Sequence, residues 1–325
     1  MPEKNNKEVF HSKVMLFGEY SIILGSMGLT IPYSHFNGEL RFINKDSYTD
    51  LDFAKHSNKQ LRELAQFIIA LQQKNQLHCN FDSQRLRDDL SNGLFFESSI
   101  PEGYGLGSSG ALVASIYNEY AVNPIESHTD IDNKEIQHLK QVFSQIESFY
   151  HGTSSGIDPL ICYLKHPIVM KDNHSISSVG IPRKSILNDD AIFLINSGKP
   201  GKTAPLVKRF MEKIKDESYL KSIQETMIPL TNDCIRFMLE GRISELFHTL
   251  PDLSHFQLSH FQEMIPKSLI EYWEKGLTSR EYLLKLCGSG GGGFMLGFTR
   301  QFTTTRHLFH EKGYELIPVY QKLLE

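Results

Sequence analysis

The chain contains the stretch Pro101-Glu-Gly-Tyr-Gly-Leu-Gly-Ser-Ser-Gly-Ala111, and the prediction of its fold starts from these residues. Residues 112–120, which follow directly, carry apolar side chains at helical spacing. The first N–H groups of a helix have no partner within the helix, and glycine lets a backbone approach a bound group closely. The stretch therefore predicts an anion-binding loop at the positive end of a helix. An ordinary loop with a serine N-cap is the alternative that this stretch alone leaves open.

The two commonest nucleotide-binding motifs do not account for this loop. No Lys-Ser or Lys-Thr pair follows its last glycine, as a P-loop requires. Gly105-Leu-Gly107-Ser-Ser-Gly110 does have the spacing Gly-x-Gly-x-x-Gly, but a dinucleotide fold needs a strand directly before it. Pro101 disfavours that strand. The loop is therefore significant only together with other motifs.

Three further motifs occur along the chain. The first, near the N-terminus, is Lys13-Val-Met-Leu-Phe-Gly-Glu-Tyr-Ser-Ile-Ile-Leu-Gly25. The second follows the loop and is His151-Gly-Thr-Ser-Ser-Gly-Ile-Asp158. The third, near the C-terminus, is Lys285-Leu-Cys-Gly-Ser-Gly-Gly-Gly-Gly293. With the loop, they resemble the motifs of the GHMP kinases, the superfamily of galactokinase, homoserine kinase, mevalonate kinase and phosphomevalonate kinase. The first motif is most similar to its mevalonate kinase version. Together the four motifs span residues 13–293.

This resemblance implies an α+β fold of two domains. Residues 1–195 would form an N-terminal half similar to domain 2 of ribosomal protein S5, and residues 196–325 a ferredoxin-like C-terminal half. The boundary is placed at the breaker segment 196–203. The implied activity is ATP-dependent phosphorylation of a small-molecule alcohol, with mevalonate as the first candidate acceptor and 5-phosphomevalonate as the product, a step of isoprenoid precursor synthesis.

The resemblance also implies where ATP and Mg²⁺ would bind. The residues expected at the ATP phosphates are Gly105, Leu106, Gly107, Ser108, Ser109 and Gly110. Magnesium would be held by Glu147, eleven residues before Asp158, and by a serine hydroxyl, for which we choose Ser109 over Ser108. Taken alone, Glu147 on its partly apolar helix stripe could equally be a rim residue paired with a surface lysine or arginine.

Two residues are expected to act on the acceptor hydroxyl. By the resemblance, Asp158 would be the general base and Lys13 would lie near the transferred phosphate. Taken alone, Asp158 would be interpreted as a helix N-cap. The other residues expected on the substrate side are Glu19, Tyr20, Thr203, Gly290 and Gly291.

Two departures from the family motif bear on the acceptor. His11-Ser12 stands where the family usually has Pro-Gly, and Tyr20 stands where mevalonate kinases often carry histidine. A phosphomevalonate, sugar or sugar-phosphate kinase is therefore the nearest competing function. A diphosphomevalonate decarboxylase is disfavoured because the phosphate loop of that family differs from Gly-Leu-Gly-Ser-Ser. A non-catalytic ligand sensor on the same fold is the alternative from another class.

Composition excludes several other classes. The net charge is −4, and the basic residues are scattered, so nucleic acid is not an expected partner. The four cysteines lie far apart, as free cytosolic thiols would. The polar N-terminus and the lack of a long apolar run predict a cytoplasmic protein with no membrane segment. The family analogy is the only ground for expecting a homodimer.

Periodicity predicts the remaining elements. A strand, a turn, and then a second short strand or the start of a helix are expected within 14–24. Helices are expected at 59–74, 136–149, 203–214, 219–239, 243–250, 262–275 and 302–312, and strands at 38–44, 94–97, 163–170, 191–195, 282–287, 294–298 and 314–319. His255 and His260 are five residues apart, a poor spacing for a helical metal site, and are interpreted as helix-flanking residues.

Overall fold

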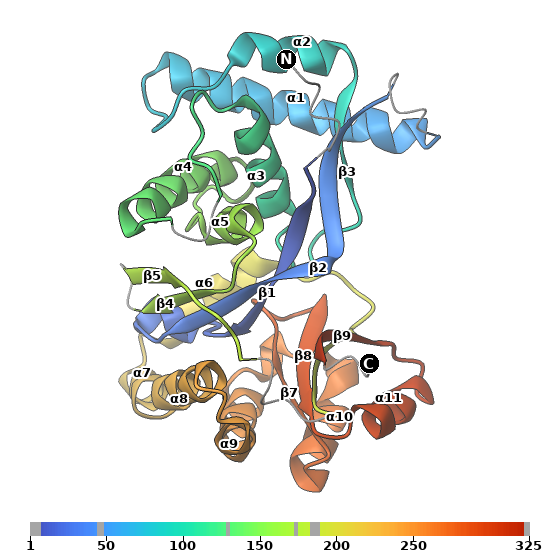
Figure 1. Cartoon of the computed structure of the whole chain (residues 1–325). Coiled ribbons are helices and arrows are strands. Elements are labelled where there is room, and N and C mark those ends of the chain that lie inside the picture. Colours follow the sequence, from blue (N-terminus) through green and yellow to red (C-terminus); the bar gives the residue numbers. More distant parts are fainter. Residues whose placement is uncertain (1–7, 44–48, 128–130, 172–174, 183–188, 322–325) are drawn as a thin grey trace. The chain divides into compact units, whose positions relative to one another are not determined.

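The computed structural model describes residues 8–43, 49–127, 131–171, 175–182 and 189–321. The chain divides into two compact units that are interleaved in sequence. Unit 1 comprises residues 1–13, 32–101 and 107–166, and unit 2 comprises residues 14–31, 102–106 and 167–325. Strands β1 (Phe10–Phe17) and β2 (Gly28–Phe42), both labelled in Figure 1, follow each other closely in the chain. Each of them contributes residues to both units.

Unit 1 is mainly helical. Its elements are α1 (Leu51–Gln73), α2 (Ser83–Ser91), β3 (Leu94–Ser98), α3 (Ser108–Tyr120), α4 (Asn133–His151) and α5 (Ile157–Leu164). Aspartates define three of the helix starts, because Asp50, Asp82 and Asp132 each accept a hydrogen bond from the backbone N–H three residues further on. At α4 this bond is part of a capping box with Glu135. Strand β3 pairs antiparallel with residues 38–42 of β2.

Aromatic side chains hold the helices of unit 1 together. The ring of Tyr117 on α3 meets Phe143 on α4 and Tyr163 on α5 edge to face, with centroids 5.1 and 5.2 Å apart. Phe67 on α1 packs against Phe149 on α4 at 5.5 Å. These contacts fix α3, α4 and α5 relative to one another, and these three helices carry most of the site residues of unit 1.

Unit 2 is built around an antiparallel sheet with the strand order β7-β8-β6-β9. The strands are β6 (Ala191–Asn196), β7 (Tyr282–Leu286), β8 (Phe294–Thr299) and β9 (Leu316–Gln321). The glycine-rich third motif forms the turn between β7 and β8, whose last pair in register is Leu286 with Met295. Two further strands, β4 (Ile168–Lys171) and β5 (Ser175–Ser178), pair with each other, and β4 also pairs with the start of β2.

Helices complete unit 2. They are a 3-10 helix (Ser21–Leu24), α6 (Thr203–Lys213), α7 (Glu217–Ser222), a π-helix (Ile223–Met227), α8 (Ile228–Leu239), α9 (Ile243–His260), a second 3-10 helix (Gln262–Met264), α10 (Lys267–Ser279) and α11 (Phe302–His310). Trp273 on α10 is completely buried, and its indole N–H donates to the hydroxyl of Ser254 on α9 at 2.8 Å. This bond ties α10 to α9.

Most predicted elements are present, and the differences have physical causes. The predicted strand at 163–170 is wrong in its first half, because Tyr163 and Leu164 end α5 and the strand begins at Ile168. A short apolar run does not distinguish a buried helix from a strand. The helix predicted at 243–250 continues to His260, so His255 and His260 lie within α9 rather than beside it.

Two other predictions concern boundaries. The predicted domain boundary after residue 195 falls at the end of β6, within unit 2. The division into two domains at this point stays a prediction. The predicted strand at 38–44 is covered by β2 up to Phe42, and Asn44 lies outside the described residues. Among the helices that the structure describes, none has the length and apolar character needed to cross a membrane.

Candidate active site

The predicted anion-binding loop leads into α3. Gly107 is the N-cap residue of α3, and its φ of 76° lies in the left-handed region that glycine favours. A Cβ added to Gly107 would lie 3.0 Å from Cγ of Lys13, so the backbone passes close to the lysine side chain. Ser108 and Ser109 form the first turn of α3, where backbone N–H groups lack helical partners. This turn therefore offers the donors that a phosphate requires.

Lys13 and Asp158 form an ion pair in unit 1. Lys13 Nζ lies 3.0 Å from Asp158 Oδ2. The lysine side chain is 8% exposed, whereas the aspartate side chain is 38% exposed, so a small molecule can reach the carboxylate. Asp158 lies in the first turn of α5, after the N-cap residue Gly156. The interpretation of Asp158 as an N-cap is therefore wrong, and its carboxylate is directed to Lys13.

Gly110 allows α3 to approach the start of α5. A Cβ at this position would lie 2.8 Å from the carbonyl carbon of Asp158 and 2.9 Å from the nitrogen of Pro159. Contacts this short with backbone atoms do not occur for real Cβ atoms, so any larger residue would push the two helices apart. The glycine in the loop motif thus sets the position of the aspartate.

Glu147 on α4 lies at the centre of a hydroxyl cluster. Ser109 Oγ donates to Glu147 Oε1 at 3.0 Å, and Ser154 Oγ donates to Oε2 at 2.5 Å. His151 Nε2, from the last turn of α4, lies 3.3 Å from Ser109 Oγ. Glu147 is only 3% exposed, which excludes the alternative of a rim position.

The surroundings of Glu147 favour its neutral form. Burial and, next, the negative charge of Asp158 raise the pKa of Glu147 to about 7. Three other interactions lower the pKa of Glu147: the hydrogen bonds from Ser154 and Ser109 and the positive charge of Lys13. They lower it by less than burial and Asp158 raise it. A further positive charge close to Glu147 would therefore stabilise its carboxylate.

These residues fit a magnesium ion. Magnesium in kinase sites prefers oxygen ligands and takes one or two carboxylates together with phosphate oxygens. The carboxylate of Glu147 and the hydroxyl of Ser109 are such ligands and lie side by side, and the carboxylate is buried at a cost that its neighbours do not compensate. Among the described residues, no group of three or more His, Cys, Asp or Glu side chains could hold a metal ion.

Unit 2 contains Glu19, which forms a second buried ion pair. Lys285 Nζ donates to Glu19 Oε1 at 2.6 Å, and both side chains are 1% exposed. Lys285 also donates to the carbonyl oxygen of Leu286 at 2.7 Å, and its ammonium lies 5.5 Å from the ring centroid of Phe17. Glu19 was predicted to line the substrate side, and in unit 2 its carboxylate is engaged by Lys285.

Tyr20 and Thr203 both bind Ser289 in the turn between β7 and β8. Tyr20 packs between the rings of Phe210 and Phe261, with centroids at 5.0 and 5.3 Å, and its hydroxyl donates to Ser289 O at 2.6 Å. Burial, followed by the charge of Glu19, raises the pKa of Tyr20. Ser289 Oγ in turn donates to Thr203 Oγ1 at 3.0 Å, and Thr203 is exposed. The turn is thus held from two sides.

The glycines of this turn are required by close backbone contacts. Gly291 N donates to Met264 O at 2.6 Å, and a Cβ on Gly290 would lie 2.3 Å from the same oxygen. A Cβ on Gly293 would lie 2.7 Å from Cα of Tyr104, in the 102–106 part of the loop. The third motif therefore packs against this first part of the phosphate loop, as the resemblance implied.

Three residues of these clusters were not predicted from the sequence. His151 and Ser154 lie within the quoted motif that ends at Asp158, but only the fold shows that they contact Ser109 and Glu147. Lys285 opens the third motif and is the one charged residue of β7, Tyr-Leu-Leu-Lys-Leu. A lysine in a fully buried strand needs a partner, and this signal could have identified it.

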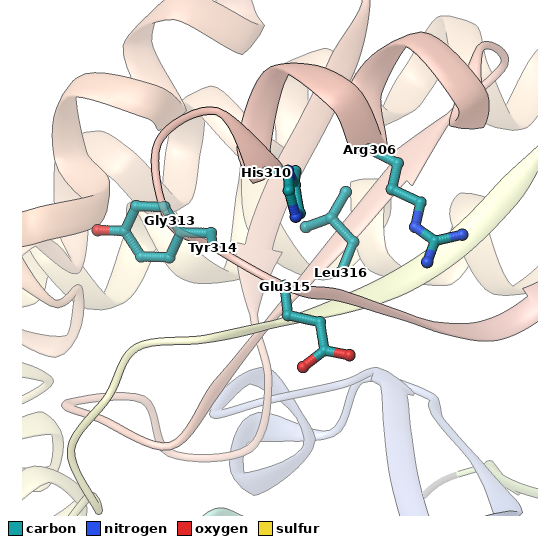
Figure 2. A pocket seen from close by; sticks show the side chains of 6 residues that line it. All are labelled: Arg306, His310, Gly313, Tyr314, Glu315 and Leu316. Atoms are coloured by element: carbon teal, nitrogen blue, oxygen red, sulfur yellow. The ribbon is translucent and has the colours of Figure 1, made fainter.

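Three cavities, each within a single unit, are lined by none of the predicted site residues. Figure 2 shows one of about 380 Å³ beside α11, lined by Arg306, His310, Gly313, Tyr314, Glu315 and Leu316. All six residues belong to unit 2. The candidate site is accordingly defined by its ion pairs and hydrogen bonds, not by this cavity.

Comparison with known proteins finds a family match for part of the chain. Residues 62–166 match the family model for the GHMP kinases N terminal domain. The matched region contains the phosphate loop, Glu147 and Asp158. The chain therefore contains a region that matches the GHMP kinases N terminal domain. The GHMP kinases are small-molecule kinases, and the match therefore indicates a phosphotransferase.

Solved structures show that the GHMP kinase fold extends over nearly the whole chain. The L. major mevalonate kinase in complex with R-mevalonate is 15% identical, with a TM-score of 0.63, and the match covers 99% of this chain and 98% of that chain. The Lactococcus lactis galactokinase complexed with galactose is 14% identical, with a TM-score of 0.65 and coverage of 97% and 94%. The Streptococcus pneumoniae phosphomevalonate kinase in complex with phosphomevalonate and AMPPNP is 15% identical, with a TM-score of 0.61 and coverage of 96% and 98%.

These structural matches show the α+β GHMP kinase fold, and they leave the acceptor open because they include kinases of different substrates. No curated protein sequence matches the chain.

Proposed function

We propose that the protein transfers the γ-phosphoryl group of ATP to the hydroxyl of a small-molecule alcohol, with mevalonate as acceptor and 5-phosphomevalonate as product. The observation that carries the proposal is the ion pair of Lys13 and Asp158 beside the N-terminal turn of α3. It places a cation and an accessible carboxylate next to the backbone donors of Gly107 to Ser109. Phosphoryl transfer depends on positioning and charge neutralisation, and this arrangement supplies both.

Asp158 and Lys13 have separate roles in this proposal. Asp158 accepts the proton of the acceptor hydroxyl as that oxygen attacks the γ-phosphorus. The ammonium of Lys13 lies 3.0 Å from the carboxylate and offsets the negative charge that accumulates on the transferred group. The low exposure of Lys13 strengthens this effect, because water screens a buried charge less.

The phosphates of ATP are assigned to the loop. Backbone N–H groups from Gly105 to Gly110 and the positive end of α3 bind them. Glu147 and Ser109 hold Mg²⁺, and Ser109 is favoured over Ser108 because its hydroxyl donates to Glu147 Oε1. Magnesium held there would supply positive charge that offsets the negative charge of the phosphates.

The acceptor is assigned from the sequence motifs and from the residues expected to contact it. Glu19, Tyr20, Thr203, Gly290 and Gly291 are proposed on the acceptor side, with Thr203 offering an exposed hydroxyl. Mevalonate is favoured by the first motif, which is most similar to its mevalonate kinase version. A cytoplasmic location, a place in isoprenoid precursor synthesis and a homodimer remain expectations.

The deciding experiment measures ADP release by the purified protein with ATP and magnesium. Mevalonate, phosphomevalonate, galactose and homoserine are supplied in turn, and Asp158→Asn serves as the control. Turnover confined to mevalonate and lost in the variant is the expected result. Turnover with another acceptor would retain the phosphotransferase mechanism and reject mevalonate. ATP binding without turnover on any acceptor would favour the ligand sensor.

A further inference from the structure

We propose that Ser154 is a positioning residue for the metal, which fixes the Glu147 carboxylate so that Oε1, beside Ser109, is the oxygen that meets the magnesium ion. This inference rests on the proposed function, because it concerns the same metal site. Ser154 does not contact the phosphates or the acceptor in the proposed arrangement. It acts through Glu147.

The hydrogen bonds of the Ser154 hydroxyl support this role. A serine hydroxyl has one proton to donate and can also accept. Ser154 Oγ accepts the backbone N–H of Gly156 at 3.0 Å, which directs its own proton to Glu147 Oε2 at 2.5 Å. Oε2 is thereby held by a hydroxyl that has no metal-binding role in the proposed site. Oε1 accepts instead from the hydroxyl of Ser109 at 3.0 Å, the other proposed metal ligand, and so Oε1 is the oxygen that faces the metal position.

The loop that carries Ser154 is anchored to the same helix as Glu147. The carbonyl oxygen of Ser154 accepts a hydrogen bond from Ser144 Oγ on α4 at 2.6 Å. Gly156 packs directly on α4, since a Cβ there would lie 2.2 Å from the carbonyl oxygen of Lys140. Ser154 therefore cannot shift independently of α4, and its hydroxyl holds Glu147 against a fixed support.

The same contacts link the metal ligand to the proposed base. Gly156 is the N-cap of α5, and Asp158 lies two residues further on in its first turn. The bonds from Gly156 N–H to Ser154 and from Ser154 to Glu147 form a continuous path from the start of α5 to α4. Removing the Ser154 hydroxyl breaks this path at both bonds.

The test measures Mn²⁺ binding by electron paramagnetic resonance, with and without a non-hydrolysable ATP analogue, on the full-length protein. Loss of a residue that orients a metal ligand typically lowers metal affinity 10- to 100-fold. Ser154→Ala is expected to weaken Mn²⁺ binding by about tenfold or more, and Ser154→Thr, which keeps the hydroxyl, to restore most of the affinity. Binding of the analogue without metal should stay unchanged in both variants.

Ser155→Ala is the matched control, because Ser155 is the exposed neighbour and its hydroxyl only accepts the backbone N–H of Ile157 at 3.4 Å. Glu147→Gln tests the metal site itself. Wild-type Mn²⁺ affinity in Ser154→Ala, with loss in Glu147→Gln, would overturn the inference and leave the proposed metal site standing. Unchanged affinity in both would overturn the metal assignment and this inference with it.

A second variant covers the case in which Ser154→Ala does not fold. Ser144→Ala removes the anchor of the Ser154 carbonyl and leaves the Ser154 hydroxyl in place. A loosened loop should weaken Mn²⁺ binding in the same direction but less. Unchanged binding in a folded Ser144→Ala protein would count against the positioning role.

Discussion

The carboxylate of Glu19 and the ammonium of Lys285 form a buried ion pair, 2.6 Å apart, between residues that are 266 positions apart in the chain. Burying two charges costs several kcal/mol per ion, and their attraction offsets this cost only while both partners are present. Lys285 is satisfied further by Leu286 O and by the face of Phe17. The pair fastens the segment after β1 to β7 within unit 2.

Removing one partner of this pair should destabilise the protein strongly. Lys285→Met keeps the apolar stem and removes the ammonium that Glu19 meets, so a buried carboxylate loses this opposite charge. The expected loss in the free energy of unfolding is about 3–5 kcal/mol, measured by urea denaturation. Lys275→Met is the control, because its pair with Glu271 is 61% and 71% exposed. That variant should change stability by less than about 0.5 kcal/mol. Equal effects in the two variants would contradict the assignment of a buried pair.

Neutralising Asp158 should remove the proposed base and keep the fold. Asp158→Asn has the same size and should lower kcat by about 10²- to 10⁴-fold, with little change in the KM for ATP. Steady-state ADP release measures both constants. Asp233→Asn provides a comparison, since Asp233 is 40% exposed, close to the 38% of Asp158, and is paired with an arginine on α8. A variant of Asp158 with wild-type kcat would leave positioning by Lys13 as the mechanism.

The raised pKa of Glu147 predicts a pH-dependent stability of the metal-free protein. Glu147 keeps its proton up to about pH 7 in the folded state, whereas in the unfolded chain it loses the proton near its ordinary value of 4.5. The folded state therefore binds more protons between these values, and stability falls as pH rises from about 4.5 to 7. The full contribution of this group is on the order of 3 kcal/mol.

Denaturation curves recorded with a chelator across this pH range check the prediction. Glu147→Gln removes the titrating group, so its stability should vary less with pH than that of the wild type. Saturating magnesium should also reduce the dependence, because a cation beside the carboxylate favours its charged form. If the free energy of unfolding of Glu147→Gln depends on pH as strongly as that of the wild type, groups other than Glu147 cause the dependence.

Enlarging Gly110 should impair catalysis more than stability. Alanine favours helix over glycine by up to about 1 kcal/mol, but its Cβ would overlap the backbone of Asp158 and Pro159. Relief requires α5 to move, which displaces the carboxylate from Lys13. Displacements of about 1 Å cost roughly 100-fold in rate, so kcat of Gly110→Ala should fall by about that factor.

Gly180→Ala is the matched substitution, because a Cβ at Gly180 would meet no atom within 4 Å. It should leave both kcat and the free energy of unfolding unchanged. Comparable kcat values in the two alanine variants would show that α3 and α5 tolerate separation.

Local sequence signals predicted most helices because their causes are local. Apolar spacing marks the buried face of α4, and the capping box of Asp132 and Glu135 marks its start. The same signals failed at Tyr163 and Leu164, where a short buried run fits a helix as well as a strand. The interleaving of the two units was not predicted. It arises because one end of β1 and of β2 belongs to each unit, and composition gives no signal for such a division.

The sequence by itself determined which chemical groups the protein has and in which order: a glycine-serine loop before a helix, an aspartate after Gly-Ile, and a glutamate eleven residues upstream. Only the tertiary structure decided their partners. Lys13 meets Asp158 because β1 and α5 are brought together, and Glu147 receives Ser109 and Ser154 from two other segments. A hydrogen bond forms only between atoms about 3 Å apart. These residues are separated by up to 145 positions in the chain (158 minus 13), so their spacing in the sequence does not predict that they are in contact.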